Sequence, residues 1–190
     1  MRHKILMTMA AIICRAAFGA EDHARLTIYV LNEGVADIEV NKVARALAAT
    51  TLSGAGISIL WRSGKARNAA PGPGITVQMC GRTPKDYHPG ALAFARPFDQ
   101  GGDIEVFYWR IWQAVPSELV GVLLGHVLVH EITHVLQGTD RHTQEGIMKA
   151  YWDANDYRRM RFKLLAFTQT DIDLIHKGFA HKQQMISSNR

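Results

Sequence analysis

The stretch PSELVGVLLGHVLVHEITHVLQG, residues 116–138, constrains the fold of this chain more than any other part of the sequence. Pro116 and Ser117 favour the start of a helix, and Gly138 favours its end. Between them the helix is apolar on nearly all sides, which is typical of a helix buried at the centre of a globular domain. The charged and titratable side chains within the stretch argue against a transmembrane span.

The residues around this helix predict a sheet and further helices. Strand-like runs lie at 24–32, 57–61, 75–80, 91–98 and 103–111. Apolar residues at helical spacing separate the first two strands, between 36 and 56. Two helices are expected near 153–165 and 171–186, the second with Thr170 as its N-cap. This order predicts a single α+β domain of the α/β type, residues 21–190. We expect a mixed twisted sheet of about four to five strands packed on the long helix, with a helical C-terminal part.

The first 20 residues have the pattern of a secretory signal peptide. Arg2 and Lys4 form a basic start, residues 5–14 form a short apolar run, and small residues lead to Ala20. The apolar run is too short to span a bilayer as a helix. We therefore expect cleavage near Ala20 and a secreted or periplasmic mature protein. The alternative is that this segment forms an apolar strand or helix of the domain.

Composition and charge limit the partners of the chain. Hydrophobic residues make up 47% and charged residues 21% of its 190 residues, the balance of a globular protein. Loss of the three cations before residue 21 lowers the formal net charge from +5 to about +2, too little to indicate a nucleic-acid partner. The dense basic run RRMRFK, residues 158–163, spreads its charges over several faces if it is helical, which favours a solvated surface. We expect no stable membrane insertion of the mature chain.

Two histidines of the long helix predict a metal site. His130 and His134 are four residues apart, so their rings leave one face of the helix roughly 6 Å apart along its axis. Two imidazoles in this arrangement can share one Zn²⁺ ion. Glu131 lies about 100° around the helix, where its carboxylate can take a proton from a water that the metal activates. The alternative is a buried helix whose histidines only form hydrogen bonds to neighbouring strands.

His126 lies one turn before His130 on the same face. Along a straight helix it is about 12 Å from His134, which is too far for both to bind one ion. We therefore assign His126 to core packing or to a hydrogen bond behind the metal ligands.

The segment HEITHVLQGTDRH, residues 130–142, followed by EGIM, resembles the metzincin clan of zinc metallopeptidases and is most similar to short archaemetzincin-like members. The family pattern is HExxHxxGxxH, followed by a tight turn with a methionine beneath the metal. The resemblance, which covers roughly residues 117–150, implies that His130 and His134 are zinc ligands and Glu131 is the general base. It implies that Met148 is the turn methionine. The implied activity is a zinc-dependent metalloendopeptidase that hydrolyses peptide or protein substrates.

The third ligand lies where this sequence departs from the family pattern. The glycine comes one position late and the third histidine two positions late, with Asp140 in the expected slot. Because Gly138 follows His134 by four residues, Gln137 can extend the helix and turn its exit direction by about 100°. A rotated exit needs a longer return path, and imidazole suits zinc well. We therefore predict His142 as the third ligand, with Asp140 as the alternative.

The resemblance also suggests roles for two regions near the site. In the family an edge strand before the active-site helix pairs with extended substrate, and residues 91–98 are the candidate for that strand; the alternative is that they are simply core. Some metzincins use a tyrosine two residues after their methionine as a metal ligand. Tyr151 comes three residues after Met148, so we expect it to serve in packing.

The sequence is also compatible with two other functions. One is a secreted zinc-binding domain that hydrolyses nothing, although a purely structural site has no need of Glu131 and usually has four protein ligands. The other is a zincin of a different type with an acidic third ligand, for which Asp153 and Asp156 lie at a suitable distance downstream. The short glycine turn and the GIM sequence favour the metzincin interpretation.

Overall fold

The computed structural model describes residues 24–32, 34–65, 74–82, 87–96 and 102–188. The expected signal peptide, residues 1–20, lies outside the described residues. The elements in chain order are β1 (Ala24–Leu31), α1 (Ile38–Ser53), β2 (Ile57–Ser63), β3 (Gly74–Cys80), β4 (Ala93–Arg96), β5 (Asp103–Phe107), α2 (Tyr108–Ala114), the 3₁₀ turn η1 (Ser117–Leu119), α3 (Val120–Gln137), α4 (Ala154–Met160) and α5 (Gln169–Ser188).

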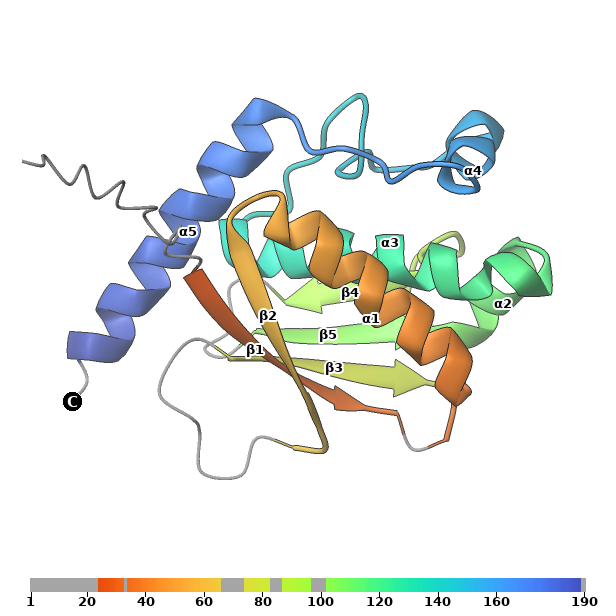
Figure 1. Ribbon diagram of the computed structural model, residues 1–190, viewed down its shortest axis with the longest axis horizontal. Helices are drawn as coiled ribbons and strands as arrows, with labels where there is room; N and C mark the ends of the chain where they lie inside the picture. The colour runs from red at the N-terminus through yellow and green to blue at the C-terminus, as the bar shows by residue number, and fades with distance from the viewer. Residues whose placement is uncertain (1–23, 33, 66–73, 83–86, 97–101, 189–190) are drawn as a thin grey trace, which may run out of the picture.

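The strands form one mixed sheet in the order β2-β1-β3-β5-β4. Four of them run parallel, and β4 pairs antiparallel with β5 at the edge of the sheet. Helices α1 and α3 lie across the same face of the sheet (Figure 1). The buried residues of β1 and β3 alternate along each strand, as one covered face requires. The predicted fold class, a mixed sheet on a long helix with a helical C-terminal part, is therefore confirmed.

Helix α3 forms the centre of the core, as the sequence predicted. Of its 18 residues, 16 are buried. Gly121 and Gly125 face α1, where an added Cβ would lie 3.0 Å from the side chains of Val43 and Leu47, so the two helices approach closely because these positions lack side chains. The segment Ser117–Gln137 is long and apolar enough to cross a membrane, yet its most apolar window is 89% buried inside the molecule. That environment is the interior of a folded domain.

The expected strand at 103–111 was wrong at its C-terminal end. β5 ends at Phe107 and α2 begins at Tyr108. The N–H of Phe107 donates to the carbonyl of Leu92 at 2.9 Å, and the pairing with β3 also ends at Phe107. Beyond Phe107 the chain no longer pairs with β3 or β4. Its next backbone N–H and C=O groups form hydrogen bonds within helix α2 instead, and this helix buries Ile111.

The expected N-cap of the last helix, Thr170, was also wrong. The N–H and the hydroxyl of Thr168 donate to the Asp171 carboxylate at 3.0 and 2.7 Å, and the N–H of Asp171 donates to the Thr168 hydroxyl at 3.2 Å. These reciprocal bonds cap the helix two residues earlier than expected.

Helix α4 is shorter than the sequence suggested. It begins at a capping box formed by Asp153 and Asp156 and ends at Met160, five residues before the expected end. The N–H groups of Arg161 and Phe162 donate to carbonyls three residues earlier, at 3.3 and 3.0 Å, which tightens and closes the last turn. The basic run 158–163 is therefore half helix and half turn.

Candidate metal centre

His130 and His134 present two ring nitrogens to one point beside α3. Their Nε2 atoms lie 3.0 Å apart and their ring centroids 4.6 Å apart. Both side chains are buried. The four-residue spacing therefore brings the two rings together as predicted, because residues i and i+4 share one face of a helix.

Backbone carbonyls determine which nitrogen of each ring faces that point. Nδ1 of His130 lies 2.8 Å from the carbonyl oxygen of Ile147, and Nδ1 of His134 lies 2.9 Å from that of Thr139. A carbonyl oxygen can only accept, so both Nδ1 atoms carry the proton and donate. In the neutral rings the two Nε2 atoms then hold lone pairs directed at each other. No hydrogen bond can join them, and a cation between them is favoured.

His142 brings a third imidazole from the loop after α3. Gly138 adopts a left-handed conformation, with φ 67°, immediately after Gln137 and so ends the helix one residue later than the family pattern does. The His142 ring centroid lies 5.3 Å from that of His130 and 4.8 Å from that of His134. One ring nitrogen of each histidine lies within 4.8 Å of the others. The structure thus brings the three predicted residues together; their role as zinc ligands remains a prediction.

Burial keeps these imidazoles neutral. Desolvation lowers the pKa of His130 to about 3 and that of His134 to about 4, and it also lowers the pKa of the more exposed His142. The carboxylate of Asp140 opposes this effect in part at His134 and His142. Because metal ions bind the neutral ring, the cluster needs no deprotonation at neutral pH before it can accept one.

The donor set fits zinc. Two nitrogens at about 2.0–2.1 Å from a tetrahedral zinc ion are roughly 3.3 Å apart, close to the 3.0 Å between the two Nε2 atoms of α3. Imidazoles whose second nitrogen donates to a carbonyl are the usual form of histidine ligand. The three-histidine cluster is therefore compatible with zinc binding.

Glu131 lies in the wall of the same cleft as the histidines. Its side chain is 9% exposed, and burial raises its pKa to about 8. The backbone N–H of Ala95 in β4 donates to the carboxylate and lowers that pKa in part. The carboxylate is thus oriented by the edge strand and stands beside the imidazole cluster without belonging to it.

The acidic alternatives for the third ligand lie outside the cluster. Asp140 lines the cleft, yet the group of convergent donors within the described residues consists of the three histidines. Asp153 and Asp156 accept from Nζ of Lys149 at 2.7 and 2.6 Å and cap α4. These two carboxylates are engaged by Lys149 and by the start of α4 and are not part of the donor cluster, which argues against a zincin that takes its acidic ligand from them.

His126 packs in the core, as expected. It is fully buried, its Nδ1 lies 2.8 Å from the carbonyl oxygen of Val122, and its Nε2 accepts from the N–H of Leu165 at 3.2 Å. Both ring nitrogens are therefore engaged, and the ring fixes the chain that leads from α4 to α5.

The expectation that Tyr151 packs was wrong. Its side chain is 68% exposed at the cleft, and its ring centroid lies 6.1 Å from that of His88. The neighbouring Trp152 takes the inner position, with its ring 5.6 Å from that of His130. Trp152 is only partly exposed and packs beside His130, while Tyr151 faces outward.

The GIM turn supports the histidines through its backbone. Ile147 and Met148 are fully buried. The Ile147 carbonyl accepts from His130, and the Met148 carbonyl accepts at 2.8 Å from the N–H of Thr143, the residue after His142. The turn thereby connects one histidine of α3 with the loop that carries the third.

Helix α5 anchors that loop from the other side, which sequence reasoning missed. The Asp171 side chain is 1% exposed and accepts at 3.0 Å from Nη1 of Arg141, the residue before His142. Nε2 of Gln137, the last residue of α3, donates to the Asp171 carbonyl at 3.1 Å. The Thr168-x-x-Asp171 spacing is a capping-box signal that identifies Asp171 as structurally fixed. No local pattern connects it with Arg141, 30 residues earlier.

A cleft of about 450 Å³ opens onto the cluster. Its walls come from β4 and the residues before it, from the histidine face of α3, and from residues 149–152 with Tyr157 of α4. Arg110 of α2 stabilises the segment before β4 at one rim of the cleft, because its Nη1 donates to the carbonyls of His88 and Ala91, both at 2.7 Å. The edge strand and the imidazoles therefore face one open space.

The fold is similar to that of archaemetzincin from Methanopyrus kandleri. The crystal structure of that protein matches with a TM-score of 0.54 at 13% sequence identity, over 89% of this chain and 99% of that one. At this identity the likeness establishes the fold alone. No protein-family description matches the sequence, and no curated protein matches it.

Proposed function

We propose that this chain is a zinc-dependent metallopeptidase of metzincin-like fold. The observation that carries the proposal is the convergence of three neutral imidazoles, two of them with opposed lone pairs, beside a buried carboxylate in one cleft. His130, His134 and His142 hold the zinc ion. The fold shared with archaemetzincin supports the same assignment.

The chemistry of the centre divides between the ion and the protein. A zinc ion held by His130, His134 and His142 would supply Lewis acidity, which would lower the pKa of a bound water towards 7 and polarise a substrate carbonyl. Glu131 takes up the proton of the attacking water and passes it to the leaving amine. Burial alone raises the pKa of this carboxyl to about 8. A cation nearby favours its ionised form, which is the form that a general base requires.

The open edge of β4 positions the peptide. Leu92 directs its carbonyl to β5, so the alternation of an antiparallel ladder turns the backbone groups of Ala93 and Ala95 to the open side. An extended peptide adds to such an edge through main-chain hydrogen bonds. The N–H of Ala95 already donates to Glu131, so the substrate pairs with the groups of Ala93 and with the Ala95 carbonyl.

We also propose that the mature protein is secreted or periplasmic, with residues 1–20 removed, and that its partner is a peptide or protein substrate. The basic start, the short apolar run and the small residues before Glu21 support this proposal. N-terminal sequencing of the exported protein should begin at or near Glu21. An exported protein that retains Met1 would contradict it.

Cleavage of a broad peptide library by the zinc-loaded protein tests the proposed activity. Wild type should cleave, and Glu131→Gln should keep stoichiometric zinc while its rate falls about 10²–10⁴-fold, the usual contribution of a general base. Glu39→Gln, an exposed substitution on α1, is the matched control and should change nothing. Activity that survives Glu131→Gln would refute the mechanism. A wild type that holds zinc and cleaves nothing would instead identify a non-catalytic zinc-binding domain.

A further inference from the structure

The segment after the cleft wall carries an unusual combination of side chains. Arg158, Arg159, Arg161 and Lys163 are all exposed. Phe162, between two of these cations, is 88% exposed, the highest fraction among the large hydrophobic residues that the structure describes. No acidic residue occurs between Asp156 and Asp171. The exposed side chains of residues 158–164 are therefore mostly cationic with one aromatic ring among them, and we call these residues the basic corner.

The backbone holds this corner in place. Met160 within it and Leu165 directly after it are buried, and the N–H of Leu165 donates to His126 in the core. The N–H groups of Phe162 and Lys163 donate to the Arg159 carbonyl, both at 3.0 Å. Phe162 is thus presented to solvent by an ordered turn.

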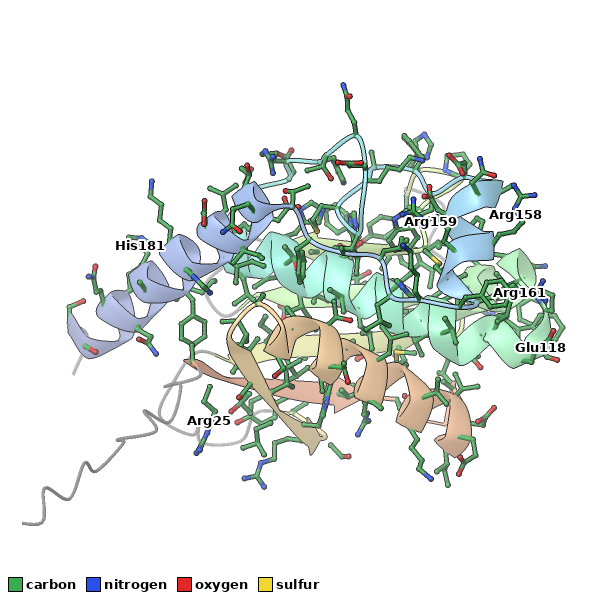
Figure 2. The ribbon with its side chains drawn as sticks, turned by 45° about the horizontal axis from the view of Figure 1, so that its top comes forward. Arg25, Glu118, Arg158, Arg159, Arg161 and His181 are labelled. Carbon is green, nitrogen blue, oxygen red and sulfur yellow. The ribbon has the colours of Figure 1, made fainter. Side chains whose placement is uncertain are left out.

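Little nearby negative charge balances the cations of the basic corner. Arg161 lies 3.8 Å from Glu118 of η1, and both side chains are about half exposed or more, so the pair is weak. Figure 2 shows Arg158 and Arg161 along the side of the molecule away from α5, with Glu118 next to Arg161. Helix α2, which precedes η1, carries two stacked and half-exposed tryptophans, Trp109 and Trp112.

We propose that the basic corner docks on an anionic phospholipid membrane, with Phe162 entering the interface and the cations facing the lipid headgroups. Single exposed hydrophobic residues are common and need no explanation. An exposed phenylalanine among four cations differs, because apolar insertion and attraction to anionic lipid act together at such a surface. An acidic peptide would account for the cations and leave Phe162 without a role. This binding is peripheral, leaves α3 in the core, and does not depend on peptidase activity.

Sedimentation of the zinc-loaded chain with vesicles tests the proposal. The protein should bind vesicles of phosphatidylglycerol and phosphatidylcholine, bind vesicles of phosphatidylcholine alone at least tenfold more weakly, and dissociate as salt is raised. Arg158→Gln combined with Arg159→Gln should weaken binding about thirtyfold, given about 1 kcal/mol per cation near the surface. Phe162→Ser should weaken binding about tenfold or more, through loss of apolar burial.

Matched control substitutions elsewhere on the surface test whether vesicle binding depends on the basic corner itself or only on the net charge and exposed apolar area of the whole protein. Arg25→Gln combined with Arg62→Gln removes the same charge from exposed strand residues; Figure 2 shows Arg25 far from the basic corner. Ile38→Ser removes an 82% exposed apolar side chain on α1. Both controls should bind as wild type does. Equal losses in the controls, unchanged binding by Phe162→Ser, or no binding to anionic vesicles would each overturn the proposal. Tighter binding to soluble polyglutamate than to the vesicles would overturn it in favour of an acidic polypeptide.

Discussion

At the scale of single residues, the orientation of two imidazoles favours the binding of a metal ion at the candidate site. The carbonyls of Ile147 and Thr139 hold the Nδ1 protons, so the Nε2 lone pairs of His130 and His134 must face each other. Such an arrangement is unfavourable without a cation. The backbone carbonyls thus orient the two imidazoles as metal ligands require, before any ion is bound.

The identity of the third ligand can be tested by two substitutions. Because the His142 ring belongs to the cluster and Asp140 does not, His142→Ala should weaken zinc binding by more than about a hundredfold. Loss of a mere hydrogen-bond partner of a ligand costs about 10–100-fold, and loss of a ligand costs more. Asp140→Ala should keep stoichiometric zinc. Competition with a chelator measures both affinities. Zinc lost in Asp140→Ala and kept in His142→Ala would reverse the assignment.

At the scale of the elements, the position of His142 depends on the contact between α3, its following loop and α5. The Asp171 carboxylate is buried and accepts from Arg141, while Gln137 donates to the Asp171 backbone. Helix α5 thus fixes both the end of α3 and the residue before His142. The C-terminal helix belongs to the support of the site, although none of its residues enters the cleft in the described part of the chain.

Removal of this anchor should weaken zinc binding while the histidines stay intact. Arg141→Ala and Asp171→Asn should each lower the affinity about 10–100-fold, as the loss of supports behind metal ligands does. The double variant should be no weaker than Asp171→Asn alone, because that substitution already removes the ion pair with Arg141, in addition to disturbing the cap formed with Thr168. In Co²⁺-substituted protein the absorption bands should shift in both variants, which loss of stability alone would not cause. Arg62→Ala is the control. Unchanged affinity and unchanged spectra would refute the role of the anchor.

Sequence patterns predicted the elements that obey local rules and missed those that depend on distant partners. The apolar run and the Gly138 stop predicted α3, and the HExxH spacing predicted two rings on one face. The exit geometry at Gly138 placed His142 in the cluster. The strand predicted at 103–111 was right as far as Phe107 and wrong beyond it, because its end depends on where β3 and β4 stop pairing. Tyr151 failed because the inner position belongs to Trp152. Neither fact is visible in local sequence.

At the scale of the whole molecule, the buried site makes the stability of the metal-free protein depend on pH. The folded-state pKa values of His130 and His134, about 3 and about 4, lie below the ordinary value of 6.5. Between pH 6.5 and about 4 the unfolded chain therefore binds protons that the folded chain does not, and stability falls as the pH falls. The pKa of Glu131, raised to about 8, acts in the opposite sense: stability falls as the pH rises from 4.5 to about 8.

Urea denaturation of the metal-free protein between pH 4.5 and pH 8 should therefore show maximal stability near neutral pH, with a loss on either side. Excess zinc should raise the free energy of unfolding at pH 7, by about 2.7 kcal/mol at a free concentration one hundred times the Kd. This increment should shrink on acidification, as protons compete for the imidazoles. A zinc increment that is the same at pH 4.5 and pH 7 would contradict coordination by histidine.

The central claim is that three histidines of one cleft hold a catalytic zinc ion, and an anomalous difference map at the zinc absorption edge tests it most directly. Crystals of the zinc-loaded protein should show one strong peak at about 2.0–2.1 Å from Nε2 of His130, Nε2 of His134 and a ring nitrogen of His142. A map without a peak in this cleft, or with a peak that contacts Asp140 in place of His142, would contradict the account.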